Sequence, residues 1–282
     1  MDKSQVLSPS LMVGFIGGGN MAQSIIKGLL REGVLKPEQF YVSAPSDRNL
    51  NKIKELGIKV THNNRDVATK CSVLFLACKP YHMVAVMEEI YGDIRVDDGQ
   101  EGHLVVPLSV GTTVELFQVR LPQGCPIIRV MPSLPSEVAA GIAMYTKSVH
   151  ASAGHVSIVE ALFKPLGCCE EVQEHLLDVT AQLGGAACAW NSIIIEALAD
   201  GAVKMGLPRV LANKLAPYSL LGTAKLIIET GVHPAQIKDN VTSPAGTTIC
   251  GVHIMEQRGV RGAMMDAIEG AVLRAREIAK DK

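Results

Sequence analysis

Aromatic residues are scarce in this sequence, and its cysteines follow no motif. Both features limit the classes of protein to which the chain can belong. Only 4% of the 282 residues are aromatic, while alanine, valine, isoleucine and leucine abound, as suits thin strands under close-packed helices. Seven cysteines form no C-x-x-C pair, and such an odd, scattered set indicates reduced thiols rather than a disulfide framework. Cys168 and Cys169 follow Gly167, which we interpret as the end of a strand, and we expect them to pack as small residues rather than form a redox pair.

Motifs for metal binding and hydrolysis are missing as well. The eight histidines form no i, i+4 pair on a convincing helix. There is no H-E-x-x-H motif, no Ser-His-Asp set and no pair of carboxylates arranged as in a glycosidase. We therefore expect no metal site. The net charge is −1 without a long basic run, so nothing favours a nucleic-acid partner.

Segments that would direct the chain to a membrane or an organelle are not evident. Residues 1–8 have no apolar signal core and no arginine-rich amphipathic stretch, so we expect a cytoplasmic protein. The most apolar helical segment, residues 187–205, carries Glu196, Asp200 and Lys204. A membrane span hardly tolerates such charges, so we expect a buried helix of a soluble protein and no membrane partner.

The first part of the chain alternates short apolar runs with helical patterns. Met21, Ile25 and Leu29 recur at helical spacing after the first apolar run. Such alternation predicts an α/β domain of the Rossmann type, whose mostly parallel sheet is covered by helices on both faces. Strands are expected at residues 12–16, 40–43, 58–61, 72–78, 104–108 and 127–130.

From about residue 170 onward the pattern indicates helices and no convincing strand. Pro208 and Pro234 stand where new helices can begin. The helices are apolar on more than one face, so a small domain cannot bury them alone, and we expect it to pack against another subunit. The expected domains are a dinucleotide-binding domain at residues 1–172 and an all-α dimerisation and substrate domain at residues 173–282.

A glycine-rich turn follows the first expected strand and precedes an amphipathic helix. Its residues fit the pattern G-x-G-x-x-A: Gly17 permits a tight turn, Gly19 lets the backbone approach a pyrophosphate, and Ala22 allows the helix to pack closely on the sheet. The helix that starts there offers free N–H groups and the positive end of its dipole. The turn predicts a dinucleotide site formed by Ile16, Gly17, Gly18, Gly19, Asn20 and Met21.

The second expected strand bears on the choice of coenzyme. An NAD site usually has a carboxylate at the tip of this strand, and the sequence Val42-Ser43-Ala44-Pro45-Ser46 has none. Ser43, together with Asn63 and Arg48, could receive a 2′-phosphate instead. An ordinary polar turn explains these residues equally well. NADPH is favoured, and NADH is the alternative.

Two further turns follow buried strands at their carboxyl ends, the side on which ligands bind in such sheets. Lys79, in the turn Cys78-Lys79-Pro80, is expected to line the cofactor cleft, although a solvated lysine is an alternative. By the same logic Ser109-Val110-Gly111 should border the nicotinamide.

A polar loop at residues 242–248 leads into an apolar run late in the chain. Ser243 and Thr247 carry hydroxyl donors, and the backbone N–H groups of residues 245–248 are expected to be free. Such a loop can bind a small carboxylate, although a simple helix N-cap is an alternative. The glycine-rich turn and this loop together suggest a reductase of a small anionic substrate.

The sequence resembles the pyrroline-5-carboxylate reductase family from about residue 13 to the end. The most specific motif is Lys238-Asp239-Asn240-Val241-Thr242-Ser243-Pro244-Ala245-Gly246-Thr247-Thr248-Ile249. The glycine-rich turn, Leu76-Ala77-Cys78-Lys79-Pro80, Arg129-Val130-Met131-Pro132 and residues 196–208 support it.

The resemblance implies an NAD(P)H-dependent reductase that transfers a hydride to the cyclic imine 1-pyrroline-5-carboxylate and so forms L-proline. It implies helical domains that interlock between two subunits, with dimers that often assemble into decamers. The cofactor would contact Ser43, Asn63, Cys78, Lys79, Pro80 and Val110, with Asn240 reaching it from the partner chain. The substrate would lie among Glu174, Ser243, Gly246, Thr247 and Thr248, with Thr248 the catalytic hydrogen-bond donor to the ring nitrogen.

The sequence departs from the family pattern at four places, one of which is the atypical run Val106-Pro107-Leu108-Ser109-Val110-Gly111. Residues 184–190 lack the usual serine and proline, Ser133-Leu134 replaces two polar groups, and Ala245 stands where the family has glycine. If Ala245 adopts positive φ, it costs about 1 kcal/mol or more. A non-catalytic NAD(P)-binding relative, or a reductase of another cyclic imine or of a β-hydroxyacid, are the alternatives.

Overall fold

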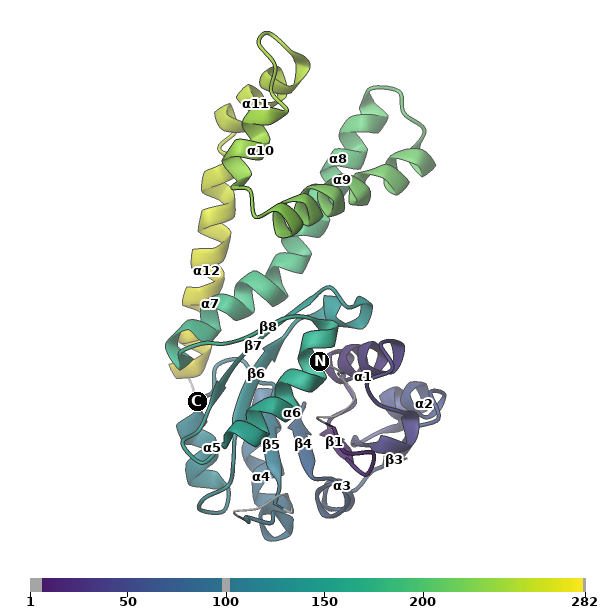
Figure 1. Cartoon of the computed structure of the whole chain (residues 1–282), viewed down its shortest axis with the longest axis vertical. Helices are drawn as coiled ribbons and strands as arrows, with labels where there is room; N and C mark the ends of the chain where they lie inside the picture. Colours follow the sequence, from purple (N-terminus) through teal and green to yellow (C-terminus); the bar gives the residue numbers. More distant parts are fainter. Residues whose placement is uncertain (1–6, 98–101, 281–282) are drawn as a thin grey trace. The chain divides into compact units, whose positions relative to one another are not determined.

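The structure, a computed structural model, describes residues 7–97 and 102–280. Contacts divide the chain into two compact units, Met1–Gly185 with Val272–Lys282 and Ala186–Ala271, which are described separately (Figure 1). The segment 1–6, in which we expected no leader, lies outside the described residues. The expected domain division at residue 172 stays a prediction.

The first unit contains the expected parallel sheet. Its strands are β1 (Val13–Ile16), β2 (Phe40–Ser43), β3 (Lys59–Thr61), β4 (Val73–Leu76) and β5 (Leu104–Pro107). They lie in the order β3-β2-β1-β4-β5, and every pair is parallel. The carboxyl-terminal ends of these strands therefore share one edge, the carboxyl edge.

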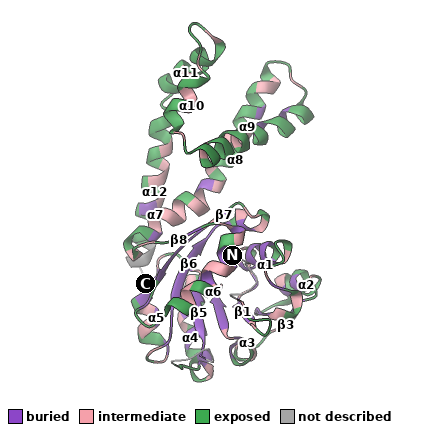
Figure 2. Cartoon of the chain, in the orientation of Figure 1, coloured by how far each residue is buried: buried purple, intermediate pink, exposed green. Residues whose placement is uncertain are grey.

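Helices cover both faces of this sheet, as the alternating pattern predicted. One face packs against α1 (Asn20–Arg31), α2 (Asp47–Lys54) and α6 (Ala153–Phe163), and the other against α3 (Asn64–Lys70), α4 (Met83–Ile90) and α5 (Val114–Arg120). Successive strand residues point to opposite faces, so Phe15 packs in the first core and Ile16 in the second. Phe15 stacks on Phe75 with ring centroids 4.5 Å apart. Figure 2 shows this burial concentrated on the strands.

A second sheet contains two strands that the sequence did not reveal. β6 (Ile128–Pro132), β7 (Gly141–Lys147) and β8 (Gly167–Glu171) lie in that order, with β6 and β7 antiparallel. A parallel bridge between Val105 and Ile127 links this sheet to β5. Gly167 begins β8, so its interpretation as the end of a strand was wrong. The run Gly-Cys-Cys-Glu-Glu carries none of the β-branched and aromatic residues that favour strands.

Short elements complete the first unit. Most are single 3-10 turns, and the segment after β8 continues through α7 (Leu177–Ala181) into a π-helical turn. The 3-10 elements are Pro37–Gln39, Pro80–His82, Tyr91–Asp93, Leu134–Val138, Lys164–Leu166 and Glu174–Leu176, and the π turn is Gln182–Ala186.

The second unit is helical, as predicted. It contains α8 (Ala187–Lys204), α9 (Arg209–Thr230), α10 (Pro234–Asn240), α11 (Thr247–Gln257) and the first part of α12 (Val260–Lys280). α9 begins directly after Pro208 and α10 begins at Pro234, which confirms both proline signals. Its apolar core in the described residues is small and centres on Ala199, Ala212 and Ala216.

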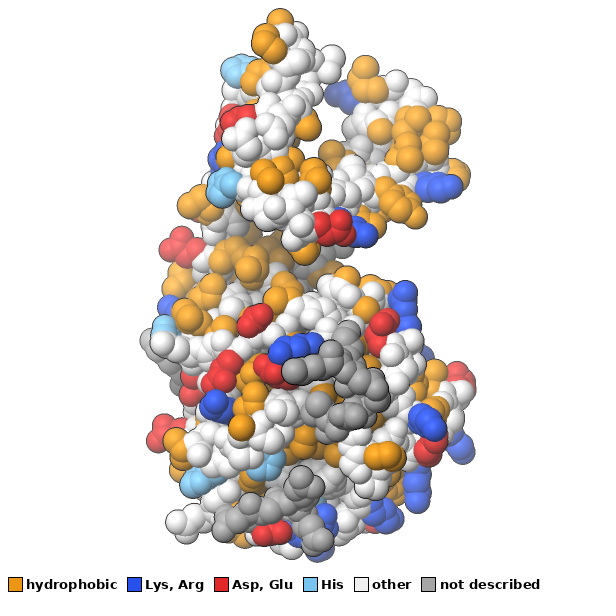
Figure 3. All heavy atoms as spheres, in the orientation of Figure 1, with side chains coloured by type: hydrophobic (Ala, Val, Ile, Leu, Met, Phe, Trp, Pro, Cys, Tyr) orange, Lys and Arg blue, Asp and Glu red, His pale blue; other side chains and the backbone are white. Residues whose placement is uncertain are grey.

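Large apolar side chains are exposed along these helices. Ile193, Met205 and Tyr218 are 64%, 84% and 65% exposed. Figure 3 shows apolar side chains (orange) gathered over the surface of α9 and α11. The helical stretch Glu174–Lys204 is also long and apolar enough to cross a bilayer by length and composition, which is weak evidence because the core helix of a soluble protein passes the same test. Only 11% of its most apolar window is buried, so the expectation of a buried helix is not met within one subunit.

Candidate active site

In the turn between β1 and α1, a side chain would clash with backbone at Gly17 but would enter open space at Gly19. Gly17 has φ +111°, and a Cβ there would meet the backbone carbon of Ala77 at 2.7 Å, so only glycine fits. Gly19 is the N-cap of α1, and a Cβ added to it would have no neighbour within 4 Å. The first N–H groups of α1 have no acceptor within the helix. Gly19 therefore leaves open space in front of amides that can bind a pyrophosphate.

The end of β2 carries a polar pair, Ser43 and Asn64, that the sequence did not predict, while the predicted cofactor contacts of Ser43 and Asn63 stay predictions. Ser43 is fully buried, and its hydroxyl donates to Oδ1 of Asn64 at 2.7 Å. The side-chain amide of Asn64 in turn donates to Glu89 at 2.7 Å. Asn63 instead caps α3, where its Oδ1 accepts the N–H of Arg65 at 3.0 Å. Two adjacent asparagines gave no basis for choosing Asn64, although a preference for asparagine at N-caps could have assigned Asn63.

Charged groups surround the turn that follows β2. His62 lies between two acceptors, with Nδ1 2.9 Å from the carbonyl oxygen of Ala44 and Nε2 3.1 Å from Asp47. Arg48 is exposed on the first turn of α2. Arg48 thus places a cationic group, and His62 an imidazole, where the ribose of a bound dinucleotide would lie.

The turn after β4 places the other predicted cofactor residues at the carboxyl edge. Lys79 is exposed, and Pro80 begins a 3-10 turn. Cys78 donates its thiol to the sulfur of Met83 at 3.8 Å, and burial raises the pKa of Cys78 to about 11. The Cys78 thiol is therefore protonated at neutral pH and acts as packing rather than as a nucleophile.

The loop after β5 is held by a buried arginine. Arg129 of β6 is 2% exposed and donates from Nε and Nη2 to the carbonyl oxygen of Ser109, at 3.4 and 3.3 Å. Glu174 accepts the N–H of Val114 at 2.6 Å and lies 3.7 Å from Nη1 of Arg129. Within the loop the side chain of Val110 is 38% exposed. The structure therefore places Glu174 beside the loop that was predicted to border the nicotinamide.

In the second unit, residues 242–248 form a turn that ends in α11. Gly246 is the N-cap and Thr247 the first helical residue. The loop therefore does begin a helix, but no Ser or Thr side chain caps it, and its binding of a carboxylate stays a prediction. Thr248 follows in the first turn, where the N–H groups of both threonines have no intrahelical acceptor. The N–H of Gly246 donates to the carbonyl oxygen of Ser243 at 3.1 Å, so the expectation that this amide is free was wrong.

Two other residues of this turn are fixed by backbone geometry. Ala245 has φ +56°, the left-handed conformation that its position in the motif suggested. A Cβ on Gly246 would overlap the hydroxyl of Ser243, so a larger residue there would require that hydroxyl to move. Asn240 ends α10, and its Oδ1 accepts from the side chain of Gln236 at 2.8 Å.

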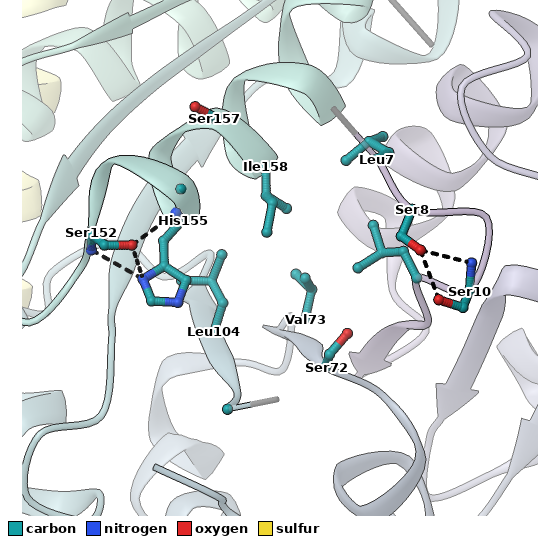
Figure 4. Close-up of a pocket in the computed structure, with 13 residues that line it drawn as sticks. Leu7, Ser8, Ser10, Ser72, Val73, Leu104, Ser152, His155, Ser157 and Ile158 are labelled. Carbon is teal, nitrogen blue, oxygen red and sulfur yellow. Dashed lines mark hydrogen bonds between the residues drawn. The ribbon is translucent and has the colours of Figure 1, made fainter. Parts of the chain in front are cut away.

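A cavity of about 570 Å³ lies away from the carboxyl edge, at the opposite ends of the strands (Figure 4). Figure 4 shows Ser152 and His155 on one side of it, with Ser8 and Ser10 on the other. The hydroxyls of Ser8 and Ser10 pair with each other, as do the hydroxyl of Ser152 and Nδ1 of His155. Among the described residues, no group of three or more His, Cys, Asp or Glu side chains could hold a metal ion.

A parallel sheet covered on both faces, with a glycine turn open at its carboxyl edge, defines a dinucleotide-binding oxidoreductase. Family models agree: "NADP oxidoreductase coenzyme F420-dependent" matches residues 12–111, and "Pyrroline-5-carboxylate reductase dimerisation" matches residues 174–278. Pyrroline-5-carboxylate reductase 3 of Xenopus laevis is 39% identical over 96% of this chain and 97% of its own. The chain belongs to the pyrroline-5-carboxylate reductase family.

Solved structures show the same fold. A pyrroline-5-carboxylate reductase from Coxiella burnetii is 31% identical, with a TM-score of 0.84 over 95% of this chain and 98% of its own. A pyrroline carboxylate reductase from Plasmodium falciparum, solved with NADP bound, has a TM-score of 0.86 over 97% of this chain and 100% of its own, at 23% identity. The second likeness shows the fold alone. The match to the dimerisation model indicates that the chain forms a homo-oligomer.

Proposed function

We propose that this protein reduces 1-pyrroline-5-carboxylate to L-proline with NADPH. The observation that carries the proposal is the relation to named reductases at 36–39% identity over nearly the whole chain. Two structural features support it. The first is the open backbone at Gly19, which suits a pyrophosphate, and the second is the exposed amino terminus of α11, which suits a carboxylate.

The cofactor, the backbone amides and Thr248 have separate roles in the proposed reaction. Bound NADPH would supply a hydride from C4 of its nicotinamide to the carbon of the C=N bond, while the π electron pair of that bond moves to the nitrogen, which takes up a proton from water. The first N–H groups of α11 hold the substrate carboxylate. The hydroxyl of Thr248 donates a hydrogen bond to the ring nitrogen and so fixes the face that receives the hydride. Positioning of this kind supplies most of the acceleration.

Preference for NADPH over NADH is part of the proposal. The tip of β2 has no acidic residue, and Arg48 and His62 lie beside it. A 2′-phosphate carries extra negative charge that these groups attract, whereas a carboxylate at this position would favour the ribose hydroxyl of NADH. The family model that matches residues 12–111 describes NADP oxidoreductases, and the Plasmodium falciparum relative was solved with NADP bound, which supports the same preference.

The assembly belongs to the proposal as well. We propose an interlocked dimer in which Asn240, Thr247 and Thr248 of one protomer complete the cofactor site of its partner, with dimers assembling into decamers. The support is the exposed apolar surface of the helical unit, whose small alanine core cannot bury it. Light scattering gives the mass of the assembly, and flotation with vesicles tests the alternative that the apolar helix inserts into a bilayer.

We also propose that the protein is cytoplasmic. All seven cysteines lie in the described part of the chain and carry free thiols, as is usual in a reducing compartment.

Activity is tested by mixing the purified protein with NADPH and 1-pyrroline-5-carboxylate and following the absorbance of the reduced nicotinamide. The expected result is decay of that absorbance together with formation of proline, measured by mass spectrometry. The matched assays replace the substrate with a six-membered cyclic imine or a β-ketoacid. Faster turnover of either, or no turnover at any pH, would overturn the proposal.

A further inference from the structure

One ion pair holds both ends of the loop that follows β5. At the start of the loop, the carbonyl oxygen of Ser109 accepts two hydrogen bonds from Arg129. At its end, the N–H of Val114 donates to Glu174 at 2.6 Å. Arg129 and Glu174 approach each other to 3.7 Å. Arg129 and Glu174, which are distant in sequence, thus hold the two ends of the loop by hydrogen bonds to its backbone.

The interior of the loop is also fixed, and one side chain is left facing outward. The hydroxyls of Ser109 and Thr112 lie 2.7 Å apart and both residues are buried. Gly111 has φ +69°, which turns the chain sharply. Val110 is the exposed apolar residue at the tip. The loop follows a strand of the parallel sheet at its carboxyl edge, where cofactors bind, so the exposed surface of Val110 is available to a flat ring.

Glu174 is not needed to cap the helix that begins at Val114. The hydroxyl of Thr113 already accepts the N–H of Leu116 at 3.2 Å and serves as the N-cap of α5. Glu174 adds a second, charged acceptor that comes from beyond β8. Asp178 lies 3.7 Å from Nη2 of Arg129, so the guanidinium is faced by two carboxylates and has partners on three sides. A guanidinium with these partners fixes the geometry of the loop and does not receive an anionic substrate, because Glu174 and Asp178 would repel a third carboxylate.

We propose that the Arg129–Glu174 pair is a clamp that holds Val110 against the nicotinamide half of the bound cofactor. Glu174 is then a positioning residue for the cofactor and not a ligand of the substrate carboxylate. The inference rests on the proposed function, since it assigns the carboxyl edge to NADPH. A preorganised loop lowers the entropy lost when the cofactor binds and keeps its reactive carbon in line with the substrate.

The test compares Glu174→Ala and Glu174→Gln with the matched control Glu171→Gln. Glu171 lies three residues away on β8 and pairs with Lys147 at the surface. Two readouts are taken: the Kd of NADPH from nicotinamide fluorescence, and the KM for 1-pyrroline-5-carboxylate at saturating NADPH.

A clamp predicts that Glu174→Ala raises the Kd of NADPH about 10-fold and lowers kcat, while the KM for the imine changes less than about twofold. Glu174→Gln should fall between, because its amide oxygen still accepts from Val114 but no longer attracts Arg129. Glu171→Gln should match the unmodified protein. A raised KM for the imine with an unchanged Kd of NADPH would make Glu174 a substrate ligand and overturn the clamp, as would no effect on either.

A second variant covers the case in which Glu174→Ala does not fold. Thr112→Val removes the hydroxyl pair inside the loop and leaves the ion pair intact, and it should raise the Kd of NADPH by a smaller factor. An unchanged Kd of NADPH in both Thr112→Val and Glu174→Gln would then overturn the clamp. Because the Kd is measured without substrate, this result is separate from a failure of the proposed reaction.

Discussion

The N–H of Gly246 donates to the carbonyl oxygen of Ser243 at 3.1 Å and closes a turn in which Ala245 has φ +56°. This turn delivers the chain into α11 with the hydroxyls of Thr247 and Thr248 on its first helical positions. The alanine at the strained position is a departure from the family pattern, and the strain is local, since the surrounding hydrogen bonds hold the turn closed.

Replacing Ala245 with glycine is expected to stabilise the protein by about 0.5–1 kcal/mol, because glycine adopts positive φ without a Cβ penalty. Thermal unfolding should show a melting temperature about 1–4 °C higher. Ala139 is the matched control, since it also has positive φ, at +57°, but lies in the first unit. Ala139→Gly should stabilise equally without altering the KM for the imine. A loss of stability in both variants would contradict this account of the strain.

The glycines of the first turn are expected to respond differently to alanine. Gly19→Ala should leave the fold intact, because its Cβ enters open space, yet it should raise the Kd of NADPH at least about 10-fold by blocking the pyrophosphate. Gly17→Ala should destabilise the fold by about 1–3 kcal/mol, because its Cβ meets the backbone of Ala77. Circular dichroism and fluorescence titration separate the two effects. Gly92→Ala, also in open space, should bind NADPH normally.

Removal of the hydroxyl of Thr248 is expected to slow the reaction. Thr248→Ala should lower kcat/KM about 10²-fold, because the ring nitrogen loses its donor, while the backbone amides still hold the carboxylate. Thr248→Ser keeps the hydroxyl and should recover most of the activity in steady-state assays. Full turnover by the alanine variant would remove this role.

Coenzyme preference should depend on Arg48. Arg48→Ala is expected to raise the KM for NADPH about 5- to 10-fold and to leave the KM for NADH nearly unchanged, because only NADPH carries the 2′-phosphate. Lys54→Ala, which removes an exposed charge at the other end of α2, is the control. An equal change for both coenzymes would place the 2′-phosphate elsewhere.

Acid should weaken the fold through His103. This residue is fully buried, its Nδ1 accepts the N–H of Arg95 at 2.7 Å, and its Nε2 lies 2.8 Å from the carbonyl oxygen of Ala68. Nε2 therefore carries the single proton. Burial lowers the pKa of His103 in the folded state, and charge from Arg95 adds to this effect.

The unfolded chain then binds a proton that the folded chain resists, so the free energy of unfolding falls as the pH drops below about 6.5. Above that pH His103 is neutral in both states, and the stability of the fold is fully retained. Denaturant unfolding at pH 7.5, 6.5 and 5.5 should show this loss, and it should be smaller in His103→Gln. An identical pH dependence in the variant would assign the effect to other groups, of which His155, whose pKa burial also lowers, is the first to test.

The sequence predicted the parallel sheet because β1, β2, β4 and β5 are mostly apolar runs between helical patterns, to which β3 (Lys59–Thr61) adds a shorter and less buried strand. It missed β7 although that strand contains the apolar run 142–145, and it missed β8 because that strand has no β-branched or aromatic residue and Gly167 was interpreted as the end of a strand. In β8 the glycine serves close approach instead: a Cβ on Gly167 would overlap the backbone of Gly141 on β7. Such a contact exists only between residues distant in sequence.

The candidate site likewise contains some features that local sequence predicts and others that only the fold produces. Gly17 and the helix start at Thr247 follow from local sequence, because turn geometry and capping depend on neighbouring residues. Whether Asn63 or Asn64 would meet Ser43 depended on the relative placement of β2 and α3, and Glu174 reads as an ordinary solvated charge until Arg129 and Val114 are beside it.

By itself, the sequence determined the two classes of element and the two amide-rich turns, because periodicity and backbone preference act over a few residues. The tertiary structure decided which side chains are paired and which are left open. In the folded chain the hydroxyl of Ser43 is bonded to Asn64, and Gly19 faces open space. Arg129 and Glu174 hold the loop that carries Val110. Those outcomes depend on distances between segments that are far apart along the chain, and no local preference encodes them.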